Sequence, residues 1–210
     1  ANHEFHETYD EVNHVARKLV RRLTDEGYDA MNAVAAFPME MQNAPGDTIP
    51  IHHKPIAEAA GIGKMGLHRN VIHPKFGNFI LLDTVLIANE VSEQSAALDY
   101  SPCIDCKLCV SACPVEAIGM DGSFNFSACY AHNYRDFMAG WADWVDQVVE
   151  AKDRDDFRTR VTPGETASVW QSLSFKPNYK AAYCVAVCPA GENVLGSFLE
   201  DRVAYNRDHV

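Results

Sequence analysis

Four closely spaced cysteines constrain the fold of this chain more than any other feature of its sequence. They run from Cys103 to Pro114 with the spacing C-x2-C-x2-C-x3-C-P. With this spacing, three thiolates on a tight loop reach three corners of one iron–sulfur cluster, and the fourth, just before the proline, reaches a neighbouring cluster. The pattern therefore predicts a domain that binds iron and transfers electrons.

A second, incomplete copy of the pattern lies near the C-terminal end. Cys184 and Cys188 repeat the ending C-x3-C-P, and Cys129 lies between the two runs. In two-cluster proteins of this kind, the cysteine before each proline ligates the other cluster. We therefore assign Cys103, Cys106, Cys109 and Cys188 to cluster one (set one), and Cys113, Cys129 and Cys184 to cluster two (set two).

Set two is one ligand short. Its fourth cysteine is expected at position 181, which is alanine, and all seven cysteines are already assigned. Three alternatives stay open: a 3Fe-4S cluster, a 4Fe-4S cluster whose last iron takes water or a non-cysteine ligand, or only one cluster in the chain. His132 and Asp136 lie near Cys129 and are candidate ligands, because imidazole and carboxylate bind iron. An open corner could also bind substrate directly as a Lewis acid.

Disulfides and zinc are the two alternatives to iron–sulfur clusters. The odd cysteine count and the lack of an apolar N-terminal signal segment indicate the reducing cytoplasm, where disulfides are rare. Zinc sites usually combine two separated C-x2-C pairs into a tetrahedron. Three cysteines at successive three-residue steps fit that arrangement poorly, so iron–sulfur clusters are favoured.

Composition narrows the remaining function classes. With 210 residues, of which 47% are hydrophobic, the chain can bury a core in one large domain or two small ones. A formal net charge of −11 argues against nucleic acid as a partner. No apolar run is long enough to span a membrane. The sequence begins at Ala1, so we expect a processed protein or a fragment.

Hydrophobic periodicity predicts the secondary structure before and after the cysteine runs. It indicates an amphipathic helix at residues 7–26, ended by Gly27, then an extended segment at 28–36 and a loop at 37–50. A short helix at 55–60, a buried strand at 78–88 and a linker at 91–100 are expected to follow. Between the cysteine runs, residues 127–150 carry an aromatic stripe typical of a helix that packs a core or shields a cluster, and residues 152–166 are charged and solvated.

Residues Gly61 to Gly66 match the dinucleotide fingerprint G-x-G-x-x-G, and Asp83 follows at about the distance of a ribose-binding acid. That fingerprint must follow a strand and open a helix. Here it follows a predicted helix and leaves no room for another, so we do not expect NAD. Gly61, Gly63 and Gly66 instead predict a close backbone approach, either to a neighbouring element or to a flat cofactor.

The order of these motifs resembles the cobalamin-dependent epoxyqueuosine reductases and reductive dehalogenases. The resemblance covers residues 49–189 and is most specific in four segments: Lys54 to Gly66, Gly77 to Phe79, Cys103 to Pro114, and Cys184 to Pro189. It implies an α+β chain, with a partial nitroreductase-like α/β domain at residues 1–98 and a helix-rich, two-cluster ferredoxin-like domain at residues 99–210.

The resemblance also implies a site beside the clusters. It places cobalamin there, with Gly61, Gly63, Gly66 and His68 as cofactor-binding residues and Asp47 as the proton-donating acid. His52, His53 and His73 are further candidates to face a cofactor or an anionic substrate. Only about a hundred residues precede Cys103, so part of the cobalamin domain is absent or is supplied by another subunit or a second copy of the chain.

Two functions follow from these predictions. The first is a cytoplasmic reductase that takes single electrons from a redox partner protein and passes them through two clusters to a cofactor or a small organic substrate. The alternative is a non-enzymatic, ferredoxin-like electron-transfer subunit of a larger complex, with the N-terminal half as a docking surface.

Overall fold

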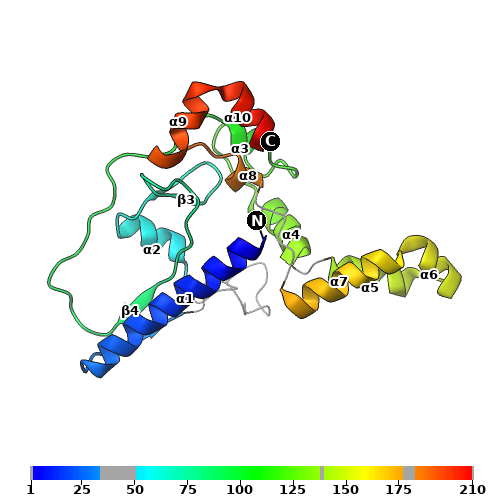
Figure 1. Ribbon diagram of the computed structural model, residues 1–210, viewed down its shortest axis with the longest axis horizontal. Helices are drawn as coiled ribbons and strands as arrows, with labels where there is room; N and C mark the ends of the chain where they lie inside the picture. The colour runs from blue at the N-terminus through cyan, green and yellow to red at the C-terminus, as the bar shows by residue number, and fades with distance from the viewer. Residues whose placement is uncertain (1, 34–50, 138–139, 177–182, 210) are drawn as a thin grey trace.

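The computed structural model describes residues 2–33, 51–137, 140–176 and 183–209. The described elements are α1 (Asn2–Asp25), β1 (Ala30–Asn32), α2 (His53–Ala59), β2 (Lys64–Met65), β3 (Val71–Ile72), β4 (Val85–Ile87), α3 (Leu108–Ser111), α4 (Phe126–Phe137), α5 (Trp141–Glu150), α6 (Arg154–Arg160), α7 (Pro163–Phe175), α8 (Tyr183–Ala186), α9 (Glu192–Glu200) and α10 (Arg202–His209). Figure 1 shows their arrangement. The predicted loop at 37–50, including Asp47, lies outside the described residues.

Helix α1 packs against a two-stranded sheet. The predicted helix is confirmed, and it ends before Gly27, whose φ of 91° only glycine adopts without strain. Strands β1 and β4 pair antiparallel, with Met31 opposite Leu86. Asn32 donates a hydrogen bond to the Asn13 side chain of α1 at 3.1 Å, which ties the sheet to the helix.

The predicted buried strand over residues 78–88 is wrong in both length and burial. Only Val85–Ile87 form a strand, and Leu86 and Ile87 are exposed. The preceding residues are irregular because they bridge other elements. Asn78 donates to the carbonyl of Val185 at 3.4 Å, and the hydroxyl of Thr84 lies 2.8 Å from Nδ1 of His53. An apolar run alone does not specify a pairing partner.

The segment from α2 to β3 packs against the C-terminal part of the chain. Ile72 is fully buried and lies against Cys188 and Ala190. The backbone amide of Glu192 donates to the carbonyl of Pro74 at 2.9 Å. These contacts cross residue 98, where the sequence predicts a domain boundary, so the division at that position stays a prediction.

Helices α5, α6 and α7 form an arm that extends to one side of the molecule (Figure 1). The sequence predicts one helix over residues 127–150, but α4 ends at Phe137 and α5 begins after Gly140, whose φ is 72°. Trp144 stacks on Trp141 at 5.4 Å and meets the ring of Phe157 edge-on at 6.0 Å. The aromatic stripe therefore packs the arm internally.

The charged segment at 152–166 forms α6 and the start of α7. Arg160 pairs with Glu150 at 3.1 Å and with Asp156 at 3.3 Å. Thr162 and Glu165 form a reciprocal capping box at the first turn of α7. Within the described residues, no helix combines the length and apolar character needed to cross a membrane.

Candidate metal centre

The loop from Cys103 to Cys109 owes its shape to two residues in the left-handed region. Asp105 and Lys107 have φ values of 55° and 63°, and their side chains form an ion pair of 2.7 Å. Left-handed backbone at non-glycine residues costs about 1–2 kcal/mol each, so the surrounding contacts must hold this turn. The loop leads directly into α3, which carries the buried Cys109.

Cys188 joins this loop from the other end of the chain. It follows the short helix α8, is buried, and packs with Ile72 and Ala190 against Cys103. All four members of set one line one small cavity that is partly open to solvent. The remaining lining residues are Leu67, His68, Ile104, Lys107, Pro189 and Ala190.

Set two lies next to set one. Cys113 follows α3, and its Sγ accepts a hydrogen bond from the Ala117 amide at 3.2 Å. Cys129 lies on α4, and its Sγ accepts from the side-chain amide of Asn133 at 3.2 Å. Cys184 lies on α8 within electrostatic reach of both of these thiols and also of Cys109 and Cys188. It is therefore the thiol that connects the two sets.

Thiol groups packed this closely resist ionisation. Burial, reinforced by the neighbouring thiolates, raises the pKa of Cys109 to about 12 and that of Cys184 to about 11. Burial likewise raises the pKa of Cys188 to about 11, although a backbone hydrogen bond from Ala190 opposes it. A bound cation reverses this preference, because thiolates are the metal-binding form and metal binding releases their protons.

The arrangement bears on the two alternatives to clusters. All seven cysteines lie in the described residues, and none forms a disulfide. A single zinc ion would draw four sulfurs to about 2.3 Å from one point. Among the described residues, no three His, Cys, Asp or Glu side chains converge on a point in this way. The shared cavity brings four thiols to one place, which is the number of ligands that a 4Fe-4S cluster needs.

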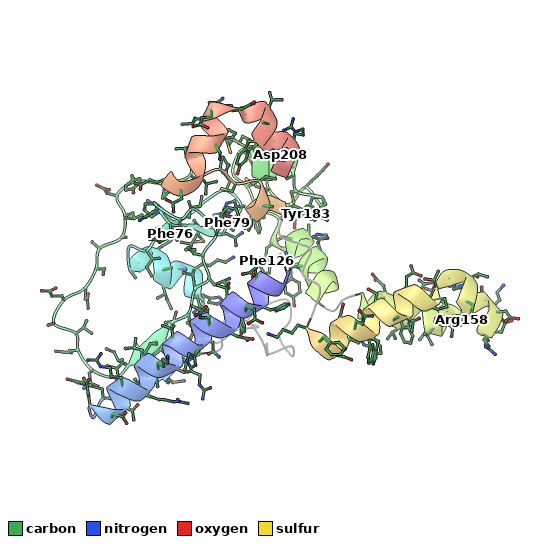
Figure 2. The ribbon with its side chains drawn as sticks, in the orientation of Figure 1. Phe76, Phe79, Phe126, Arg158, Tyr183 and Asp208 are labelled. Carbon is green, nitrogen blue, oxygen red and sulfur yellow. The ribbon has the colours of Figure 1, made fainter. Side chains whose placement is uncertain are left out.

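The candidates for the missing ligand of set two are only partly described. His132 lies one turn after Cys129 on α4, and its ring centroid is 6.4 Å from that of Tyr183, the residue before Cys184. Tyr183 lies where α8 comes next to α4 (Figure 2). The side chain of Asp136 and position 181 lie outside the described residues.

Two basic side chains, Lys54 and His68, lie beside the cysteine sets. The pKa of Lys54 is lowered overall, because the effect of burial outweighs the opposing attraction of the nearby Cys129 and Cys184 thiolates. Burial, followed by repulsion from Lys54, lowers the pKa of His68 to about 4. The imidazole is therefore neutral at physiological pH. Asn70 joins the two, because its Oδ1 accepts from Nζ of Lys54 at 2.9 Å and its backbone amide donates to Nδ1 of His68 at 3.1 Å.

The three predicted cofactor-binding glycines face the chain itself. A Cβ atom at Gly61 would overlap the carbonyl of Ala96, one at Gly63 would overlap the carbonyl of Ile72, and one at Gly66 would overlap the side chain of Ile72. Close packing against a neighbouring element accounts for all three glycines. The segment runs into β2 and β3 rather than into a helix. A cofactor role for these glycines stays a prediction.

The other predicted histidines, His52, His53 and His73, lie away from the cavity of set one. The ring of His53 is buried against Thr84, and Nδ1 of His73 accepts from the backbone amides of Lys75 and Phe76 at 3.0 and 3.3 Å. His52 is exposed. Of the predicted histidines, His68 is the one that lines the cavity of set one.

Sequence reasoning missed the cover over set one. Burial and the thiolates of Cys188 and Cys106 raise the pKa of Tyr205, which places this α10 residue near the set. Its ring meets Phe198 of α9 edge-on at 5.4 Å. Both residues are buried, so α9 and α10 shield the cysteines. The amphipathic pattern after Gly191 was the signal available in the sequence.

Comparison with known proteins supports iron binding. The family described as "4Fe-4S binding domain" matches residues 96–119. Epoxyqueuosine reductase from Staphylococcus aureus is 34% identical over 83 residues, which cover 40% of this chain and 21% of that protein. The enzyme of the same name from Prochlorococcus marinus is 38% identical over 88 residues, 41% of this chain and 27% of that protein. The chain thus spans about a fifth to a quarter of the length of these relatives.

Two solved structures show a weaker likeness. Epoxyqueuosine reductase from Streptococcus thermophilus is 24% identical, with a TM-score of 0.40 over 57% of this chain and 31% of that one. A selenomethionine-labelled epoxyqueuosine reductase is 21% identical, with a TM-score of 0.47 over 88% of this chain and 39% of that one. Both scores are low, so neither bears on the fold. The sequence matches nonetheless confirm the predicted resemblance: about two fifths of this chain is similar to epoxyqueuosine reductases, and residues 96–119 match the 4Fe-4S binding domain family.

Proposed function

We propose that this chain is the electron-transfer part of an iron–sulfur reductase. Set one would hold a 4Fe-4S cluster, and set two would hold either a 3Fe-4S cluster or a 4Fe-4S cluster with one non-cysteine ligand. The observation that carries the proposal is the position of Cys184, beside both Cys129 of set two and Cys188 of set one. Because the two cysteine sets lie so near each other, an electron would have only a short path between two clusters bound there.

The residues around set one support this role. When bound, the clusters supply one-electron oxidation and reduction. Leu67, Ile104 and Pro189 line the cavity of set one with apolar surface, and Tyr205 of α10 lies near Cys188 and Cys106. Exclusion of water and control of hydrogen bonding are the means by which a protein sets the potential of such a centre.

Set two is the better candidate for the point where electrons leave. Its three thiols are half-buried, and it lacks a fourth cysteine. We propose that a redox partner protein delivers electrons and that a cofactor or small organic substrate receives them near set two. Cobalamin is the cofactor that the resemblance implies, in a pocket that a second subunit or a second copy of the chain completes. The free thiols suit the cytoplasm.

A specific observation also favours the second candidate, a non-enzymatic carrier subunit. Gly61, Gly63 and Gly66 pack against the chain's own backbone and side chains, and the cavity lined by set one is the site for a cluster rather than for a substrate. The carrier would use the same cysteines for the same electron transfer but would have no substrate pocket of its own.

Analysis of anaerobically purified protein tests the shared part of the proposal. We expect about seven or eight iron atoms per chain, with matching sulfide and two distinct paramagnetic resonance signals on reduction or oxidation. About four iron atoms would leave one cluster, and iron-free protein that cannot be reconstituted would refute the proposal. Bound cobalamin would favour the reductase over the carrier.

Asp47 gives a test of the enzyme itself. The resemblance makes Asp47 the proton donor, so Asp47→Asn should abolish reduction of epoxyqueuosine, the first substrate to assay because the relatives are named for it. The spectra of both clusters should stay unchanged, since no cysteine is altered. Normal turnover by the variant would remove Asp47 from the mechanism.

A further inference from the structure

His68 lies in the wall of the cavity that set one surrounds. It is only 4% exposed, and it lines that cavity together with Cys103, Cys106, Cys109 and Cys188. It belongs to the turn between β2 and β3, which the carbonyl of Asn70 and the amide of Gly66 close with a hydrogen bond of 3.0 Å. The ring is therefore held by a short hairpin rather than by a long loop.

One hydrogen bond fixes where the proton of this ring resides. The backbone amide of Asn70 points at Nδ1 of His68 from 3.1 Å. A backbone amide can only donate, so Nδ1 must carry a lone pair. A neutral imidazole with a lone pair on Nδ1 carries its proton on Nε2. Nε2 is therefore a hydrogen-bond donor and has no lone pair with which to ligate iron.

This donor lacks an acceptor in the protein. Nε2 of His68 is buried and has no hydrogen-bond partner among the described residues. A buried donor without an acceptor is destabilising, and such groups in native proteins usually have an explanation. Apart from Lys107, whose ammonium can only donate, the side chains that share the cavity wall are the four thiols and apolar groups. Among the side chains that line the cavity, the thiols are thus the acceptors.

We propose that Nε2–H of His68 donates a hydrogen bond to a sulfur atom of cluster one and thereby raises its reduction potential. The inference rests on the proposed function, because it needs a cluster held by set one. The reduced cluster carries one more negative charge than the oxidised one, so a donor aimed at its sulfur stabilises the reduced form more. His68 is then a residue that sets the cluster's potential and is not an iron ligand.

The test is an anaerobic redox titration of the full chain, followed by paramagnetic resonance, on three variants. His68→Phe keeps a flat ring but removes the N–H. His68→Gln keeps a side-chain N–H near the same place. His73→Phe is the matched control, because His73 also accepts the amide two residues ahead on its Nδ1 but does not line the cavity.

We expect His68→Phe to disfavour reduction of cluster one. At the wild-type midpoint potential, the ratio of reduced to oxidised cluster one should fall about tenfold, which corresponds to about 59 mV for one electron. His68→Gln should recover most of that shift, and His73→Phe should show none. An unchanged potential in His68→Phe with full iron content, or a shift confined to cluster two, would overturn the proposal.

Pulsed resonance on wild-type protein labelled with ¹⁵N-histidine gives an answer that needs no variant. A weakly coupled nitrogen on reduced cluster one, accompanied by an exchangeable proton, is the expected result. A strongly coupled nitrogen would mean ligation, and no coupling would mean no hydrogen bond; either would overturn the inference. Absence of cluster one from wild-type protein would instead refute the proposed function, so the two failures are distinguishable.

Discussion

Set one surrounds a cavity with mainly apolar walls, whereas set two lies among polar side chains. Ile104 and Leu67 lie against set one, and Cys188 is buried. In set two, Cys129 accepts a hydrogen bond from Asn133 and lies within electrostatic reach of Lys54. Two neighbouring sites built from the same residue type thus differ in the side chains around them and in ligand number.

This difference suggests a division of roles. A site with four cysteines and mainly apolar walls suits storage of an electron at a potential that the protein controls. A site with three cysteines and polar surroundings suits exchange with a cofactor or substrate. The following predictions test whether the sets are separate sites and whether they differ as described.

Of the changes considered, replacement of one cysteine should have the largest effect on cluster content. Cys188→Ala should remove the resonance signal of cluster one and about four iron atoms per chain, because a buried ligand of set one is lost. Cys184→Ala should remove the signal of cluster two instead. Iron analysis and resonance spectra of both variants measure this. If Cys188→Ala removes the cluster-two signal, the assignment of Cys184 and Cys188 to different sets is wrong.

A new cysteine at position 181 should change set two without touching set one. Ala181→Cys supplies the ligand that the spacing rule places three residues before Cys184. If wild-type cluster two is 3Fe-4S, the variant should lose the signal of the oxidised three-iron form and gain one iron. His132→Ala is the companion variant: lower iron content there, with rescue in the double variant, would identify His132 as the present ligand.

The sequence was most informative where chemistry fixes spacing. The spacing rule led us to expect Cys188 beside the Cys103 loop, and the structure places them together, although ligation itself stays a prediction. Helix α1 followed from its apolar periodicity. The prediction of a strand over 78–88 was wrong because strand formation depends on a pairing partner. In the part of the chain that the structure describes, β1 alone pairs with this run, and only with residues 85–87.

The surroundings of the cysteines could not be predicted from local sequence. His68 was predicted as a cofactor-binding residue, but its place in the wall of the set-one cavity was not predicted, and its proton position depends on the backbone amide of Asn70. The cover that Phe198 and Tyr205 provide depends on how α9 and α10 return over set one. The break at Gly140 was visible as a glycine, but the aromatic periodicity across it suggested a continuous helix.

Iron-free protein should lose thermal stability as the pH rises above 9. The pKa of Cys109 rises from 9.0 to about 12 in the folded chain. Above pH 9 the unfolded chain loses these protons and the folded chain keeps them, so ionisation favours unfolding. We expect the Tm of iron-free protein to hold below pH 9 and to fall between pH 9 and about 12.

Thermal unfolding under chelating and reducing conditions measures this dependence. Iron-loaded protein is the first control, because its cysteines are already thiolates. Cys109→Ser is the second, since a serine hydroxyl does not titrate in this range. A Tm of the iron-free wild type that falls no more steeply than that of Cys109→Ser would contradict the raised pKa.

The smallest effect is expected in the arm. Thr162 caps α7 by accepting the amide of Glu165 at 3.2 Å, and the Glu165 carboxylate accepts the amide of Thr162 at 2.7 Å. Thr162→Ala should destabilise the arm by about 1 kcal/mol. The three tryptophans of the chain, Trp141, Trp144 and Trp170, all lie in α5 and α7, so their fluorescence during urea unfolding reports on the arm.

The Thr162→Ala variant also tests whether the stability of the arm affects the cluster bound by set two. Helix α4 carries Cys129 and is followed in the chain by α5, so the arm adjoins set two but not the cavity of set one. If α4 is held by its contacts near the cysteines, Thr162→Ala should leave both cluster signals and both potentials unchanged. A shift in cluster two alone would show that arm stability is transmitted through α4, and set two would then differ from set one in mechanical support as well as in its ligands.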